Sequence, residues 1–349
     1  MTDPSPELQA TPAGLSTPAS AATSEPRATS TNPAAVLGLF RFTIDGRRAP
    51  GLFVAGWLAT VVGGSGAFVG LLAGQTVPGA VLFVGGLAVM LVGLVLLGGS
   101  QAIERRAAEL AYAGPSPILV FASIVVGLYL AVVVVATPLR LLGVRLDGPG
   151  LSLLGVILQA IVVVGILRAL VVGPGALSWA EMGLRGPMPA ALRDLAWGMV
   201  LAAPIVLVTA VVVAALVTIV GSTPESPLPP AGSSVGLAIN LLAGALIAPL
   251  YEELLFRGFA TTAWARVVPP AAAIVRTSLL FAFAHLLTQS GASFSEALGI
   301  ALVAGVARLP VAFALGWVFL RRRSLWAAVG LHAAYNGILI VLAEAALRT

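Results

Sequence analysis

The chain of 349 residues contains no cysteine, which excludes disulfides, thiolate metal ligands and cysteine nucleophiles together. Charged residues are scarce as well: they make up 9% of the chain, against roughly 25% in an average soluble domain. Hydrophobic residues reach 59%, and the mean hydropathy is +1.03. This composition excludes an ordinary soluble protein and predicts an all-α, polytopic bundle of transmembrane helices.

Lysine is absent too, because all 19 basic residues are arginines. These arginines are scattered between apolar runs and form no basic patch, so they argue against a nucleic-acid partner and for a topology signal. The lysine-free, Ala/Val/Gly-rich composition is typical of a GC-rich bacterial genome. We therefore expect a bacterial multi-pass protein of the cell (plasma) membrane, with the lipid bilayer as its first partner.

A helix needs about 20 apolar residues to cross the hydrocarbon core of a bilayer. The predicted spans are roughly 51–74, 78–99, 117–139, 149–173, 196–221, 234–256, 270–289, 299–320 and 324–347. The seventh is the weakest, because it contains Arg276 and fades into polar residues at its end. Eight spans with one re-entrant or interfacial segment is therefore the competing prediction.

Arginines in the connecting segments alternate between the two sides of the predicted bundle. By the positive-inside rule, the richer side is cytoplasmic and contains the N-terminus. That side holds Arg27, Arg41, Arg47, Arg48, Arg105, Arg106, Arg185, Arg193, Arg257, Arg266 and the Arg321–Arg323 cluster, whereas Arg140, Arg145 and Arg348 lie on the other.

Composition divides the chain into three parts. Residues 1–36 contain six prolines and no apolar periodicity, which predicts a disordered cytoplasmic tail. Residues 37–173 form N-terminal transmembrane helices with few ionisable groups. The polar segment 174–195 then introduces residues 174–349, which hold every group that can carry chemistry.

The chain has only two histidines, His285 and His332, and both lie in apolar stretches. The pair Glu252-Glu253 also lies within apolar sequence. An ionisable side chain in the membrane costs about 2.5–3.5 kcal/mol on insertion scales. Such a concentration of costly residues indicates chemistry inside the membrane.

Spacing brings these groups together. If the sixth span continues as a helix and turns near 268–270, Glu252 and His285 lie equally far from the turn, each about 25 Å along its helix. A hairpin then sets carboxylate and imidazole at the same depth. Three pairs at i, i+4 spacing share a helix face: Glu253 with Arg257, Phe281 with His285, and His332 with Asn336.

These three pairs, with Glu252 before the first, resemble the signature motifs of the CPBP intramembrane proteases, the CAAX protease and bacteriocin-processing family. The resemblance covers roughly residues 175–347. It implies an intramembrane endopeptidase acting on a membrane-associated protein or peptide. Glu252 would activate water with help from His285, His332 and Asn336 would stabilise the oxyanion, and Glu253, Arg257 and Phe281 would support them.

The resemblance leaves the metal open, since such proteases have been described both as metalloproteases and as glutamate proteases. If a divalent metal such as zinc takes part, Glu252, His285 and His332 are its ligands. No His-Glu-x-x-His motif is present, and we favour a mechanism without an obligatory metal.

Other functions compete with proteolysis by this site. A proton-coupled transporter also buries Glu and His, although its polar residues are usually spread over repeated halves. A non-catalytic membrane scaffold is a third reading. Ser65 in Gly63-Gly-Ser-Gly66 matches a rhomboid-type nucleophile pattern, but close helix packing explains those glycines better. Arg168, Arg276, Arg308 and Glu344 are predicted to be interface pairs or snorkelling groups.

Overall fold

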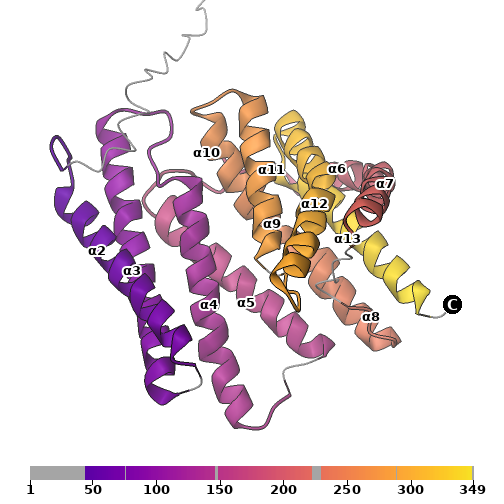
Figure 1. The fold of residues 1–349 in the computed structure, drawn as a ribbon. Coiled ribbons are helices and arrows are strands. Elements are labelled where there is room, and N and C mark those ends of the chain that lie inside the picture. The colour runs from indigo at the N-terminus through magenta and orange to yellow at the C-terminus, as the bar shows by residue number, and fades with distance from the viewer. Residues whose placement is uncertain (1–43, 75, 146–147, 222–228, 288, 348–349) are drawn as a thin grey trace, which may run out of the picture. The chain divides into compact units, whose positions relative to one another are not determined.

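A computed structural model describes residues 44–74, 76–145, 148–221, 229–287 and 289–347. These ranges contain helices and connecting turns and no strand, so the all-α prediction is confirmed (Figure 1). The described residues form one compact unit. The predicted tail 1–36 lies outside the described residues, and the boundary between 173 and 174 stays a prediction.

Eight helical stretches within the described residues are long and apolar enough to cross a membrane. All eight overlap predicted spans, although the second, fifth and sixth are longer than predicted at one end. The predicted seventh span is a shorter helix, α11 (Pro270–Leu286), whose 17 residues rise only about 25 Å. The described residues thus contain eight candidate spans and one shorter apolar helix, and the choice between nine spans and eight stays a prediction. The spans are Pro50–Leu72, Val77–Ala107, Pro117–Leu141, Pro149–Val172, Met188–Val220, Ser234–Ala265, Phe294–Arg322 and Leu325–Ala346.

The fifth span begins earlier than predicted. It consists of α6 (Met188–Val200) and α7 (Ala202–Val220), so residues 188–195, read from sequence as part of a polar connection, are helical. Pro204 lacks the N–H that would bond the carbonyl of Val200, which accounts for the break between the two helices.

Helices α2 (Pro50–Leu72) and α3 (Val77–Ala107) lie side by side as an antiparallel hairpin (Figure 1). Glycines on both helices allow the backbones to touch: a Cβ at Gly63 would lie 2.3 Å from the amide nitrogen of Met90, and one at Gly86 would lie 2.2 Å from that of Ala67. Close packing is the role predicted for Gly63. Ser65 is exposed on this hairpin and faces away from the contact.

Two further helices connect the N-terminal part to the rest. Helix α4 (Pro117–Leu141) packs on α3, and α5 (Pro149–Leu167) packs on α4 and on the segment that carries the glutamate pair. The hydroxyl of Tyr251 donates a hydrogen bond to Gln159 of α5 at 2.9 Å. One apolar core therefore includes residues from both sides of the predicted boundary, from Tyr112 to Tyr335.

The last two helices are α12 (Phe294–Arg322) and α13 (Leu325–Ala346). Helix α13 crosses α6 at backbone contact, since a Cβ at Gly198 would lie 2.0 Å from the Ala327 carbonyl oxygen and one at Gly330 would lie 2.0 Å from that of Leu195. This contact fixes α13 two residues before His332.

Candidate active site

One long, irregular helical stretch carries the glutamate pair. It runs through α8 (Ser234–Asn240), a π-helical turn η2 (Leu241–Ile247), α9 (Ala248–Glu253), a second π-helical turn η3 (Leu254–Thr261) and α10 (Thr262–Ala265). π-helical turns are rare and frequently lie at functional sites, because the wider turn changes the direction of the side chains. The glutamates are therefore flanked on both sides by departures from regular α-helix, which apolar periodicity alone does not predict.

Glu253 is held by a buried ion pair. Arg257 Nη1 lies 3.0 Å from Glu253 Oε1, and neither side chain is exposed at all. Arg257 Nη2 donates to the carbonyl oxygen of Ala312 on α12 at 3.1 Å. The predicted i, i+4 pair is thus present, and it also ties α12 to the glutamate segment.

His332 lies between the two glutamates. Its Nδ1 is 2.7 Å from Glu253 Oε1, and its Nε2 is 3.9 Å from Glu252 Oε2. We assign the proton on Nδ1 as donated to Glu253, whose oxygen also accepts from Arg257. The ring is thereby oriented, and Nε2 is left on the side of Glu252.

Exposure separates the two carboxylates. The Glu253 side chain is completely buried, whereas that of Glu252 is 19% exposed. A carboxylate that exchanges protons with water needs this access. Glu252 is therefore the carboxylate of the pair that a ligand can reach, and Glu253 is the one in close contact with His332.

The Phe281 ring packs against both histidines of the site. Its ring centroid is 4.6 Å from that of His285 and 5.8 Å from that of His332. The Arg257 guanidinium carbon lies 4.6 Å from the same centroid, within range of a cation–π interaction. Phe281 therefore touches all three groups, more than the single contact with His285 predicted from spacing.

His285 is oriented by its own helix, since its Nδ1 lies 2.8 Å from the carbonyl oxygen of Phe281. This contact assigns the proton to Nδ1. His285 reaches the cluster through Phe281, while His332 is the histidine beside the glutamates.

Asn336 lies one turn after His332 on α13. Its Nδ2 donates to the carbonyl oxygen of Gly244 at 2.8 Å. Gly244 belongs to η2, so Asn336 and His332 both contact the irregular stretch, Asn336 at η2 and His332 at the last residue of α9. Spacing predicted the shared face, but not that the Asn336 amide also fastens α13 to that stretch.

Arg308 of α12 is a residue that the sequence analysis assigned to a structural role. It acts electrostatically on both Glu252 and His285. Its Nη1 donates to the Ala304 carbonyl oxygen at 2.8 Å. It stands one turn from Ala312, which accepts from Arg257, and so on the face of α12 directed at the site. In the sequence, the only sign of such a role is that Arg308 is a charged residue within a predicted span.

The proposed metal ligands do not assemble into a site. Within the described part of the chain, no three His, Asp or Glu side chains come together in a way that could hold a metal ion. Glu253 and Nδ1 of His332 are engaged with each other, and Nδ1 of His285 is engaged with a backbone carbonyl.

Comparison with known families supports the resemblance seen in the motifs. Residues 234–338 match the family model described as type II CAAX prenyl endopeptidase Rce1-like. The match covers under a third of the chain, but it spans the glutamate pair, both histidines and Asn336. It confirms the similarity to CPBP intramembrane proteases for this segment. No curated protein and no solved structure matches the chain.

Proposed function

We propose that the protein is an intramembrane endopeptidase that hydrolyses a peptide bond in a membrane-associated protein or peptide. The observation that carries this proposal is the pairing of a partly exposed Glu252 with an oriented His332, 3.9 Å away, inside a cluster that also contains Glu253 and Arg257. The matched family model, a type II CAAX prenyl endopeptidase, supports the same reaction class.

Glu252 is the general base of the proposed reaction. A water molecule between Glu252 Oε2 and His332 Nε2 can hydrogen-bond both at about 2.8 Å, an ordinary distance for such bonds. Glu252 removes one proton as the water oxygen attacks the scissile carbonyl carbon. The same proton then passes to the leaving amine, the C–N bond breaks, and the products are a carboxylic acid and an amine.

Negative charge on the carbonyl oxygen is stabilised by groups around this position. Asn336 can donate from its amide, and His332 can donate from Nε2 when that nitrogen is protonated. Arg308 adds a positive charge that acts on the same region. Donors fixed in a site that excludes water contribute about 3–4 kcal/mol each to the stability of the transition state.

The remaining residues position the reactive ones. Glu253 orients the His332 ring, Arg257 offsets the charge of Glu253, and Phe281 packs beneath both imidazoles. His285 helps to bind and orient the attacking water. This division of roles follows the exposure of Glu252 and the complete burial of Glu253.

The two other candidate functions lack such support. The polar cluster gathers at a single place between helices α9, α11, α12 and α13, whereas a transporter with repeated halves distributes its polar residues over matching positions. A scaffold does not require a partly exposed carboxylate beside an oriented histidine. The prenylated CAAX substrates of the matched family provide a first substrate class to test.

The orientation of the chain belongs to the same proposal. The arginine distribution supports a cytoplasmic N-terminus, and we propose the plasma membrane as the membrane that holds the protein. The connection between α10 and α11, which contains Arg266, then lies on the cytoplasmic side. Substrates would reach Glu252 from within the bilayer or from that side.

Purified protein in detergent, incubated with a library of quenched fluorescent peptides that includes prenylated CAAX sequences, tests the proposal. We expect cleavage by the wild-type protein and none by Glu252→Gln, whose amide is nearly isosteric but cannot accept the proton. Each sample is repeated with a chelator to test for a metal. Equal cleavage by the two proteins would show that Glu252 is not the base.

A further inference from the structure

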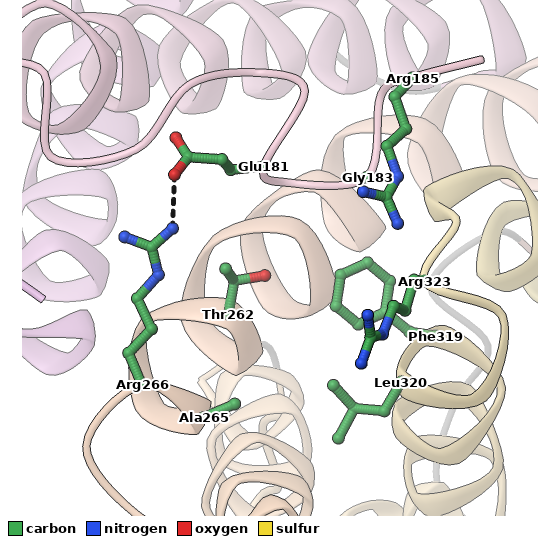
Figure 2. Close-up of a pocket in the computed structure, with 9 residues that line it drawn as sticks. All are labelled: Glu181, Gly183, Arg185, Thr262, Ala265, Arg266, Phe319, Leu320 and Arg323. Atoms are coloured by element: carbon green, nitrogen blue, oxygen red, sulfur yellow. Dashed lines mark hydrogen bonds and ion pairs between the residues drawn. The ribbon is translucent and has the colours of Figure 1, made fainter. Parts of the chain in front are cut away.

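A second polar site lies away from the glutamate cluster, where two membrane-spanning stretches end. It is a cavity of about 220 Å³ lined by three arginines, Arg185, Arg266 and Arg323, and by one carboxylate, Glu181 (Figure 2). Drug-sized ligand sites are usually larger, about 300–1,000 Å³. The cavity therefore suits a small, negatively charged group.

The single carboxylate in this cavity is already neutralised. Glu181 accepts hydrogen bonds from the backbone amide and the hydroxyl of Ser178 at 2.7 and 2.8 Å, and from Arg266 at 2.6 Å. The Ser178 backbone amide, Arg266 and the Ser178 hydroxyl together lower the pKa of Glu181 from 4.5 to about 2. Three arginines and one carboxylate leave a formal charge of +2, carried by Arg185 and Arg323.

Those two arginines have no counter-charge. Within the described parts of the chain, neither guanidinium forms a hydrogen bond or an ion pair with a protein group. Figure 2 shows the Arg185 side chain entering the cavity from the loop after α5 and η1 (Arg168–Val172), and Arg323 entering from the end of α12. Two like charges facing the same space repel each other unless an anion lies between them.

The backbone holds the cavity in shape. Leu325 N–H donates to the carbonyl oxygen of Gly183 at 3.1 Å, which ties the loop to the turn after α12. Gly183 has φ +90°, and a Cβ there would lie 2.8 Å from Leu325 N. Arg323 has φ 51° at the end of α12, a conformation that costs a non-glycine residue roughly 1–2 kcal/mol. Both arginines are thus presented from fixed backbone.

The position of the cavity indicates the source of the anion. Its lining includes Ala265 and Phe319, at or near the ends of the spans Ser234–Ala265 and Phe294–Arg322. The ends of spans lie at the level of lipid headgroups. Arginine is well suited to phosphate because its planar fork donates two hydrogen bonds at once.

We propose that Arg185 and Arg323 bind the phosphate of an anionic phospholipid headgroup, or a free phosphate, in this cavity. Phe319 and Leu320 provide an apolar wall for the glycerol carbons. The site is independent of the glutamate cluster and of the proposed proteolysis. It would hold the loop 178–187 against the ends of η3, α10 and α12 when the phosphate is bound.

Ligand-dependent thermal melting of the full chain in neutral detergent tests this site. The ligands are short-chain phosphatidylglycerol, short-chain phosphatidylcholine and inorganic phosphate. We expect phosphatidylglycerol to bind more tightly than phosphatidylcholine, whose choline cation is repelled by the arginines. Stabilisation by inorganic phosphate would identify the phosphate alone as the ligand, and stabilisation by phosphatidylglycerol alone would identify the lipid headgroup.

Matched variants separate the cavity from general surface charge. Arg185→Gln with Arg323→Gln should weaken phosphatidylglycerol binding at least about tenfold, because each charged hydrogen bond is worth that much. Arg193→Gln with Arg321→Gln removes two exposed arginines outside the cavity and should leave binding unchanged.

A variant that adds positive charge keeps the test decisive if the double variant folds poorly. Glu181→Gln frees Arg266 and raises the formal charge of the cavity from +2 to +3, so it should tighten binding. Equal binding of the two lipids, equal loss in both double variants, or no change in Glu181→Gln would overturn the proposal.

Discussion

The buried pair of Glu253 and Arg257 allows a prediction about stability that can be worked from the structure. Replacing Glu253 by Gln removes the charge but keeps an oxygen that can accept from His332. Arg257 is then left buried with its hydrogen bond to the Ala312 carbonyl oxygen and no opposite charge from Glu253. Breaking a buried pair by removing one member costs about 3–5 kcal/mol. At about 2 °C per kcal/mol for a large chain, the expected fall in melting temperature is roughly 6–10 °C.

Replacing Arg257 by Met should cost less. Glu253 then keeps its 2.7 Å contact with His332, and the expected loss is about 1–3 kcal/mol. The double variant has neither charge, so it should be more stable than the sum of the single effects predicts, by about 1–3 kcal/mol.

Thermal melting of the four proteins in one detergent, followed by tryptophan fluorescence, measures these differences. The matched control is the wild-type protein carried through the same purification. A melting temperature of Glu253→Gln within 2 °C of the wild type, or strictly additive effects in the double variant, would refute the claim that the pair is buried and coupled.

Three further predictions concern other parts of the chain. Gly330→Ala should destabilise the protein by about 1–3 kcal/mol, because the added Cβ forces α13 away from α6. Gly337→Ala is the control, since its Cβ would lie 3.6 Å from the Cβ of Ala245, an ordinary contact. Equal melting temperatures of the two variants would contradict the close crossing. Hydrogen bonds, first of all from the Ser178 amide, lower the pKa of Glu181. The carboxylate therefore contributes to the free energy of unfolding above pH 4.5, and this contribution is lost as the pH falls toward about 2. Because its side chain is 47% exposed, that contribution is at most about 1 kcal/mol; the stability difference between wild type and Glu181→Gln should shrink over this pH range, and a constant difference would contradict it. Ser65→Ala should cleave peptides at the wild-type rate, since this exposed residue lies on the α2–α3 hairpin; an inactive variant would restore the rhomboid reading.

The sequence predicted the helical class and most of the spans because apolar runs of membrane length have few alternatives in a bilayer. It placed the turn between Glu252 and His285 correctly at Pro269 and Pro270, the N-cap and the first residue of α11. The early start of α6 escaped prediction, since a helix that begins outside the apolar run carries no hydropathy signal.

Within the site, i, i+4 spacing predicted the Glu253–Arg257 pair and the contact of Phe281 with His285. It did not predict that His332 is the histidine beside both glutamates, because distances between helices depend on how they pack. The crossing of α6 and α13 sets that packing through backbone contacts at glycines. In a chain with so many glycines, no pattern singles these out.

The π-helical turns and Arg308 also required the structure. A π-helical turn changes the facing of residues by inserting one position, and the sequence around η3 follows no pattern that distinguishes it from α-helix. An isolated arginine in a span is equally compatible with snorkelling and with a site. Its position one turn from Ala312, the acceptor of Arg257, puts it on the face of α12 that packs against the glutamate segment.

The most direct test of the account is the turnover number of Glu252→Gln on a peptide that the wild-type protein cleaves. The predicted result is a fall of about 10²–10⁴-fold, the usual contribution of a general base, with an unchanged melting temperature. Turnover within a few-fold of the wild type, by a protein shown to be free of contaminating protease, would contradict the assignment of Glu252 as the group that activates water.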